Sequence, residues 1–273
     1  MMDSIYKFIL RRPFFRGQDR IFGYLFNHGK LARHNQTVEP LEGNFKINCD
    51  PTTWIGAKII YTGNYEASLK KIFRSLIKDG DHVLDIGANI GFHTLYFAEL
   101  VGSTGTVTAF EPVPKNYNEL STNIEINGVQ SIIAKNIALG IINETITIRA
   151  DDNSNNPGAY NLFDKEGNVT IECRIGDEVV VDNEKIDFIK IDVEGYEAFV
   201  INGLQKTISK HKPVIIFEYD NNYHKKTNLP EDHIFTTLNR LGYGFQYILQ
   251  NDIKIISSFK EIKSANILAR PHA

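Results

Sequence analysis

After residue 50, the sequence alternates between short apolar runs of strand length and longer segments with helical spacing. Strand-like runs lie at 82–87, 105–112, 131–140, 144–150, 185–192, 212–220 and 265–271, with a hairpin at 243–257. Helix-like segments precede and separate them at 67–77, 92–101, 114–128, 196–210 and 231–242. Strands that alternate with crossover helices form a parallel sheet covered on both faces. The predicted fold class is therefore α/β, in which ligands bind at the carboxyl ends of the strands.

The composition is that of an ordinary globular protein, with 42% apolar and 23% charged residues among 273. A net charge of −3 argues against a chain devoted to binding nucleic acid. The two cysteines, Cys49 and Cys173, are too few and too far apart for a disulfide framework or a cysteine-based zinc site. No apolar run reaches the roughly 18 residues of a membrane span, and residues 1–15 make a poor signal peptide. We therefore expect a cytoplasmic protein with no transmembrane segment.

Residues 1–50 differ from the rest of the chain, and we predict that they form a helical N-terminal extension. Residues 1–40 hold seven lysines and arginines against three acids, with aromatic residues interleaved in PFFRGQDRIFGYLF. The simplest interpretation is one or two helices packed on the main domain. The alternatives are a lid over the substrate site, an oligomer contact, or a weak contact with an anionic membrane surface. The composition fits all four, and it leaves the oligomeric state open.

A glycine-rich turn follows the strand-like run at 82–87, in the sequence HVLDIGANIGFHTLYFAEL. A dinucleotide site has the spacing Gly-x-Gly-x-x-Gly, because a pyrophosphate must approach the backbone at a helix N-terminus. Here the spacing is Gly87-x-Asn89-x-Gly91, and Asp85 stands before it, where an acid would repel a pyrophosphate. Such an acid suits a ligand with a positive amine and no phosphate, such as S-adenosylmethionine. Glu111, at the end of the next strand, is placed to accept hydrogen bonds from both ribose hydroxyls.

Three segments, VLDIGANIGFHTLYFA, AFEPVPKNYNELSTNIEING and IDFIKIDVEGYEAFVINGL, resemble the FkbM family of S-adenosylmethionine-dependent methyltransferases. TGNYEASL before the first strand and ANILARP near the end extend the resemblance over roughly residues 55–270. The resemblance implies a class I methyltransferase (Rossmann-like) domain, which we place at 51–273. Its sheet would have seven strands, mostly parallel with the last antiparallel, and helices on both faces. The resemblance also implies methyl transfer to oxygen on a sugar, a glycan or a secondary metabolite.

The resemblance also assigns roles to individual residues. The cofactor-binding residues would be Asp85, Gly87, Asn89, Gly91 and Glu111, with Asn136 and Ala138 beside the adenine. Glu66, in TGNYE, matches a family position near the mouth of the active site.

Two histidines and one polar segment are further candidates for the substrate side. His93 lies in the first turn after the glycines and would border the methionine end of the cofactor, and His224 follows YDNNY. The polar segment 151–160 is a candidate cover for the substrate. Lys190 is a weaker candidate, because it points to the opposite strand face from Ile189 and Ile191.

A second group of acids lies at the end of the strand-like run 185–192, in KIDVEGYE. In an extended strand end, Asp192 and Glu194 point to the same side, where the cofactor should lie. Glu197 falls in the first turn of the next helix, where an acid is stabilising on its own account. We predict that Asp192 and Glu194 are catalytic, because methyl transfer to oxygen is helped by a group that holds the hydroxyl and accepts its proton.

Two alternatives for this acidic group remain open. Asp192 and Glu194, together with Glu218 from the neighbouring strand, would be able to hold a divalent metal that acidifies the hydroxyl, although we do not favour this reading. The acids would otherwise serve to position the cofactor or a loop.

Together these features predict an O-methyltransferase that acts on a small-molecule or glycan acceptor. The alternative is an inactive protein with the methyltransferase fold that binds the cofactor as a scaffold or sensor, although such a scaffold has no use for Asp192 and Glu194. The glycine spacing disfavours a nicotinamide oxidoreductase. The chain also lacks an Asn/Asp-Pro-Pro-Tyr/Phe motif for a flipped base, which disfavours a nucleic-acid methyltransferase.

Overall fold

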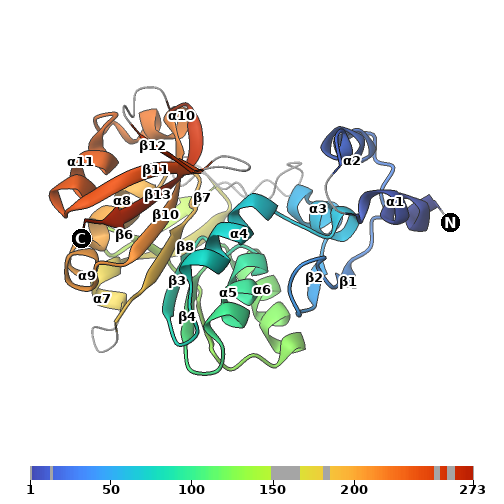
Figure 1. Cartoon of the computed structure of the whole chain (residues 1–273), viewed down its shortest axis with the longest axis horizontal. Helices are drawn as coiled ribbons and strands as arrows, with labels where there is room; N and C mark the ends of the chain where they lie inside the picture. The colour runs from blue at the N-terminus through green and yellow to red at the C-terminus, as the bar shows by residue number, and fades with distance from the viewer. Residues whose placement is uncertain are drawn as a thin grey trace.

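The computed structural model of the chain describes residues 2–12, 15–148, 167–180, 185–248, 253–256 and 262–272. Its centre is an eight-stranded sheet with the order β12-β11-β13-β10-β9-β3-β4-β5 (Figure 1). The strands are β3 (His82–Ile86), β4 (Thr106–Phe110), β5 (Ile132–Lys135), β9 (Phe188–Ile191), β10 (Val214–Asp220), β11 (Tyr243–Ile248), β12 (Ile253–Ile255) and β13 (Ser264–Pro271). The strands β3, β4, β5, β9 and β10 run parallel, whereas β13 is antiparallel to both β10 and β11. The predicted class I methyltransferase fold is confirmed, with β12 as an additional edge strand.

Helices cover both faces of this sheet, as predicted. One face packs against α4 (Ala67–Leu76) and α5 (Phe92–Val101), and the other against α8 (Glu197–Gly203) and α11 (His233–Arg240). The central strand β9 is buried along its whole length, with Phe188 in one core and Ile189 in the other. The carboxyl ends of β3 and β9 lie side by side, where the strand order reverses, and this is where open α/β sheets bind ligands.

Two predicted elements are each divided in the structure. The run 131–140 forms β5 and then β6 (Ala138–Gly140), which joins β7 (Glu144–Ile148) and β8 (Val169–Ile175) in a separate three-stranded sheet. Between β5 and β6, the Asn136 amide donates to the carbonyls of Glu111 and Pro112, which fixes the chain just past the end of β4 at the point where it leaves the large sheet. The segment 196–210 forms α8 and then α9 (Gln205–His211), which are separated by the non-helical backbone of Leu204, with a φ of −110° and a ψ of 15°.

The N-terminal segment contains two short strands in addition to helices. Its elements are α1 (Met2–Leu10), α2 (Gln18–Asn27), β1 (Gln36–Val38) and β2 (Ile47–Cys49), followed by α3 (Trp54–Thr62). Figure 1 shows them gathered at one end of the molecule, far from β11 and β12. The helices α1 and α2 pack on α3, where the Trp54 ring meets Phe22 and Phe26 edge-on. Among the described residues, none of the helices combines the length and the apolar character that crossing a bilayer requires.

One long helix and three short ones complete the described chain. They are α6 (Pro114–Asn127), α7 (Gly176–Val179), α10 (Asn221–His224) and the 3₁₀ turn η1 (Lys225–Thr227). The helix α6 links the two parts of the molecule, because its Asn123 side chain accepts the backbone N–H of Asn48 in β2 at 2.7 Å.

Candidate active site

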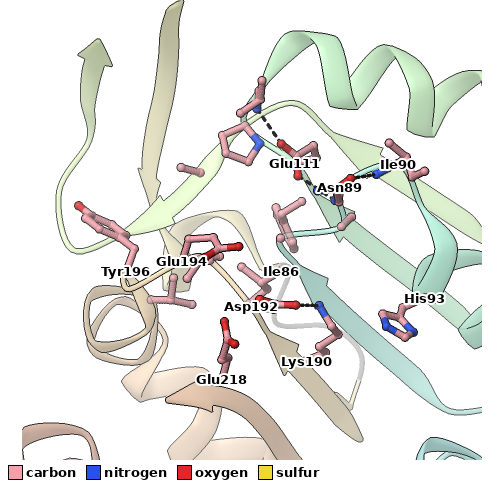
Figure 2. Close-up of a pocket in the computed structure, with 18 of the residues that line it drawn as sticks. Ile86, Asn89, Ile90, His93, Glu111, Lys190, Asp192, Glu194, Tyr196 and Glu218 are labelled. Carbon is pink, nitrogen blue, oxygen red and sulfur yellow. Dashed lines mark hydrogen bonds and ion pairs between the residues drawn. The ribbon is translucent and has the colours of Figure 1, made fainter. Parts of the chain in front are cut away.

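A pocket lies at the carboxyl ends of β3, β4, β9 and β10 (Figure 2). It brings together most of the predicted site residues, which come from segments far apart in the sequence. Those on its wall are Glu66, Gly87, Asn89, His93, Glu111, Ala138, Asp192, Glu194 and Glu218. The predicted residues Asp85, Gly91, Asn136 and His224 do not line it.

The turn after β3 has a backbone that suits glycine. Gly87, Asn89 and Gly91 all have positive φ angles, of 84°, 51° and 90°. A Cβ on Gly87 would lie 1.8 Å from the backbone oxygen of Asp192, so the turn passes directly against the end of β9. Asn89 adopts the left-handed conformation that asparagine tolerates, and its side chain accepts the Ile90 N–H at 2.8 Å. Gly91 does not line the pocket, and it is the N-cap residue of α5.

Glu111 is held at the pocket by backbone donors. One carboxylate oxygen accepts the N–H of Asn89 at 2.8 Å, and the other accepts the N–H of Val113 at 2.9 Å (Figure 2). Burial raises the pKa of Glu111 to about 7, against the opposing effect of these hydrogen bonds. The oxygen that accepts Asn89 keeps a lone pair for a ligand, whereas the oxygen that accepts Val113 also accepts the Asn116 amide at 3.5 Å, a long and weak hydrogen bond.

Asp85 is fully buried beneath the pocket and does not reach its wall. One oxygen accepts the hydroxyl of Thr94 at 2.6 Å. The other lies 3.8 Å from the Lys190 ammonium and has no hydrogen-bond partner. In this arrangement Asp85 ties α5 to β9, so it supports the turn from below.

Lys190 is the functional candidate that the sequence interpretation underrated. Its ammonium lies on the pocket wall, 3.1 Å from Asp192, as Figure 2 shows. Burial alone would lower the pKa of Lys190, but the carboxylates of Asp192, Asp85 and Glu66 outweigh it and raise the pKa. A lysine within an apolar strand was the signal available in the sequence, since an almost fully buried lysine needs a charged partner.

Asp192 and Glu194 line the same pocket but differ in their electrostatics. Burial would raise the pKa of Asp192, yet Lys190, His93 and a hydrogen bond with Glu218 outweigh it and lower the pKa. Burial and the charge of Asp192 raise the pKa of Glu194 to about 7. The extended geometry assumed from the sequence is absent, because β9 ends at Ile191 and Glu194 has a φ of 51°.

Glu218 faces this group from β10, on the side of the pocket that Asp192 and Glu194 occupy in Figure 2. Burial, followed by the charges of Asp192 and Glu194, raises its pKa to about 9. The raised pKa favours the neutral form of Glu218, in which its carboxyl proton is available for a hydrogen bond with Asp192. Among the three acids, Asp192 is the one within ion-pair distance of Lys190, and it is also the one whose pKa is lowered.

Glu66 and His93 form a second contact on the pocket wall. The His93 ring meets a carboxylate oxygen of Glu66 at 2.8 Å through its Nε2 atom. The ring packs against Phe73 and Phe97, and its Nδ1 atom is buried without a hydrogen-bond partner. Glu66 has a left-handed backbone with a φ of 50°, which directs the start of α4 toward the pocket.

Two candidates, Glu197 and His224, instead have structural contacts, and a third falls outside the described residues. The carboxylate of Glu197 accepts the N–H groups of Val193 and Gly195, both at 3.1 Å, and so caps the start of α8. His224 is buried, with its ring hydrogen-bonded to the carbonyl of Pro230 at 2.7 Å. The segment 151–160 lies outside the described residues.

The described part of the chain has no group of three or more histidine, cysteine, aspartate or glutamate side chains arranged to hold a metal ion. Asp192, Glu194 and Glu218 are therefore not such a group in this conformation. The Lys190 ammonium already contacts Asp192 on the side facing Asp85.

Several apolar residues on the pocket wall escaped the sequence interpretation. They are Phe92, Phe110, Val113, Ile137, Leu139, Val200 and Tyr196. Apolar residues at strand and helix ends look like ordinary core in a sequence, so no local signal distinguished them.

Comparisons with known proteins agree with this geometry. Residues 85–245, more than half of the chain, match the methyltransferase FkbM domain family. "Methyltransferase 1" of Beauveria bassiana is 27% identical over 187 residues, which cover 60% of this chain and 74% of that protein. The hexuronic acid methyltransferase AglP of Haloferax volcanii is 29% identical over 141 residues, which cover 51% of this chain and 56% of that protein.

One solved structure carries the same family name. The methyltransferase FkbM from Methylobacillus flagellatus KT superposes with a TM-score of 0.46 at 15% identity. The superposition covers 78% of this chain and 52% of that one, so this chain spans only about half of the longer relative.

Proposed function

Because the chain belongs to the FkbM methyltransferase family, we propose that it transfers a methyl group to a hydroxyl oxygen of a sugar, a glycan or a secondary metabolite. The methyl donor of the family is S-adenosylmethionine. A sugar acceptor is supported by the hexuronic acid methyltransferase among the relatives, whose similarity to this chain covers 56% of that protein. The proposal divides the pocket into a cofactor end, around Glu111, and an acceptor end, around Asp192.

The cofactor end offers a group for each part of S-adenosylmethionine: the ribose, the adenine and the methionine carboxylate. The ribose hydroxyls would bond to Glu111 through the free lone pair on one oxygen and by displacing the long Asn116 hydrogen bond on the other. An apolar wall for the adenine lies beside it, formed by Val113, Ile137, Ala138 and Leu139. The first N–H groups of α5 have no acceptor within the helix, which suits the methionine carboxylate. When bound, the cofactor supplies an electrophilic methyl group on a positive sulfur.

The observation that carries the proposal is the group of carboxyls at the acceptor end, Asp192, Glu194 and Glu218, which line one pocket with the Lys190 ammonium 3.1 Å from Asp192. Lys190 keeps Asp192 ionised, whereas burial brings the pKa of Glu194 to about 7. A general base works best when its pKa is close to the working pH. We therefore assign Glu194 to accept the hydroxyl proton, and Asp192 to hold the hydroxyl and stabilise the positive charge that grows on its oxygen during attack.

A transfer assay with methyl-labelled S-adenosylmethionine tests this function. Neutral sugars, hexuronic acids, nucleotide sugars and polyketide alcohols would be offered in parallel, each with and without a chelator. We expect a labelled product that resists mild alkali, because a methyl ether is stable where a methyl ester is hydrolysed. An alkali-labile product would mean that the methyl group is transferred to a carboxylate of the acceptor. Loss of transfer in the presence of chelator would favour the metal alternative. Tight cofactor binding without transfer to any class would favour the inactive scaffold.

A further inference from the structure

The helix α1 presents a continuous apolar face to solvent. Met2, Ile5, Phe8 and Ile9 are all exposed, Phe8 by 70% and Met2 by 59%. At 100° per residue these four positions fall within an arc of roughly 120°, which is a typical width for an amphipathic stripe. Six of the twelve large hydrophobic side chains that are exposed in the described part of the chain lie in α1 and α2. We call the four residues of α1 the N-terminal apolar face.

The opposite side of α1 makes the contacts with the rest of the protein. Leu10 is fully buried, and Asp3 accepts the hydroxyl of Tyr61 in α3. At the end of the helix, Gln18 donates to the carbonyl of Leu10 at 2.7 Å and so ties α2 to α1. The helix is therefore anchored through one side, and the N-terminal apolar face takes no part in that anchoring.

Exposed cations outnumber exposed acids in this part of the chain. In residues 2–12 and 15–35, the exposed charged side chains are Arg12, Arg16, Arg20, Lys30 and Arg33 against the single acid Asp19. The Arg12 guanidinium lies 4.4 Å from the centre of the Phe8 ring, so a cation adjoins the apolar face directly. The chain as a whole is negative, with a net charge of −3, so this positive charge is local.

We propose that the N-terminal apolar face binds the surface of a membrane rich in anionic lipids. An amphipathic helix with basic residues beside its apolar stripe binds in the plane of such a surface, with apolar side chains in the acyl boundary and cations at the headgroups. A second copy of the chain is a poorer occupant. A symmetric dimer would set this patch against itself and bring the same cations together. This inference is independent of the acceptor, since it uses no residue of the pocket.

Flotation of the full chain with vesicles tests the proposal. We expect binding to phosphatidylcholine vesicles that contain phosphatidylserine, little binding to phosphatidylcholine alone, and release at high salt. Arg16→Gln and Arg20→Gln should each lower the partition coefficient about fivefold, and Phe8→Ser about tenfold or more. The matched controls are Lys254→Gln and Ile255→Ser, which remove an exposed cation and an exposed apolar residue from β12 at the other end of the molecule.

The outcomes are separable. Unchanged cofactor affinity in all the variants shows that they are folded, and selective loss of vesicle binding in the α1 and α2 variants supports the proposal. Absence of wild-type binding to anionic vesicles overturns it. Equal loss in the β12 controls also overturns it. A concentration-dependent dimer that Phe8→Ser dissociates, without vesicle binding, would assign the face to a second copy instead.

Discussion

The two ends of the pocket are built differently. At the cofactor end, backbone N–H groups hold the functional side chain, since Asn89 and Val113 both donate to Glu111. At the acceptor end, side chains hold one another through charge, as Lys190 holds Asp192. The position of a side chain that backbone N–H groups hold is set by the fold itself. The position and charge of a side chain that an ion pair holds depend on the partner side chain. The comparison suggests that binding of the cofactor and the chemistry of transfer can be separated by mutation.

Removal of Lys190 should have the largest effect, because the buried Asp85 and the partly buried Asp192 both lose their cation. We expect Lys190→Met to lower the free energy of unfolding by about 3–5 kcal/mol, the usual result of breaking a buried ion pair. Urea denaturation measures the loss. The double variant with Asp192→Asn should recover part of it, since one unpaired charge is then gone. Additive losses in the double variant would mean that the two residues are not coupled.

Gly87 tests the backbone-held end. We expect Gly87→Ala to cost about 2–4 kcal/mol of stability or to abolish cofactor binding, because the new Cβ meets the backbone of Asp192 at a positive φ. Gly128→Ala is the matched control. Gly128 also has a positive φ but has no atom within 4 Å of its ideal Cβ. Thermal unfolding and calorimetry would compare the two, and equal effects would show that close packing at Gly87 is unimportant.

Glu111→Gln should weaken S-adenosylmethionine binding by about 1–3 kcal/mol and leave the acceptor end intact. The amide nitrogen of glutamine would face one of the two backbone donors, Asn89 or Val113, and has no lone pair for a ribose hydroxyl. Isothermal titration calorimetry gives the affinity. Wild-type affinity in this variant would remove Glu111 from the cofactor site.

A smaller effect is the pH dependence of cofactor affinity. The pKa of Glu111 is raised to about 7, so the carboxylate form that accepts ribose hydroxyls is lost as the pH falls through 7. We expect the affinity to decrease about tenfold between pH 8 and pH 6, the range in which most of this group becomes protonated. In Glu111→Gln the decrease should be absent. A decrease of the same size in that variant would assign the titration to another group, such as Glu194.

The alternation of strands and helices predicted the sheet, its covered faces and the edge where the acids meet. Asp192 and Glu194 were predictable because they follow a buried strand at that edge. The contact of Lys190 with Asp85 was not predictable, because these residues lie opposite each other only in the pairing of β3 with β9. The contact with Asp192 joins two residues that are close in the sequence, but an extended strand places alternate side chains without saying that they form an ion pair.

The division of 131–140 was also hidden from the sequence. No proline or glycine marks the break, which instead depends on the Asn136 amide reaching carbonyls at the end of β4. His224 stood beside a strand end in the sequence, but its ring turns toward Pro230 and away from the pocket. The direction of a side chain that follows a strand is set by tertiary contacts, and these contacts cannot be read from the neighbouring residues in the sequence.

The separation of binding from chemistry is tested most directly by measuring single-turnover rate and cofactor affinity together in Glu194→Gln and Asp192→Asn. The control variant is Glu125→Gln, which removes an exposed acid on α6. Positioned proton transfer is typically worth about 10² to 10⁴ in rate, so both pocket variants should slow transfer by a factor in that range while the dissociation constant for S-adenosylmethionine stays within about threefold of wild type. Near wild-type rates in both variants, or a loss of cofactor affinity that matches the loss of rate, would contradict the account.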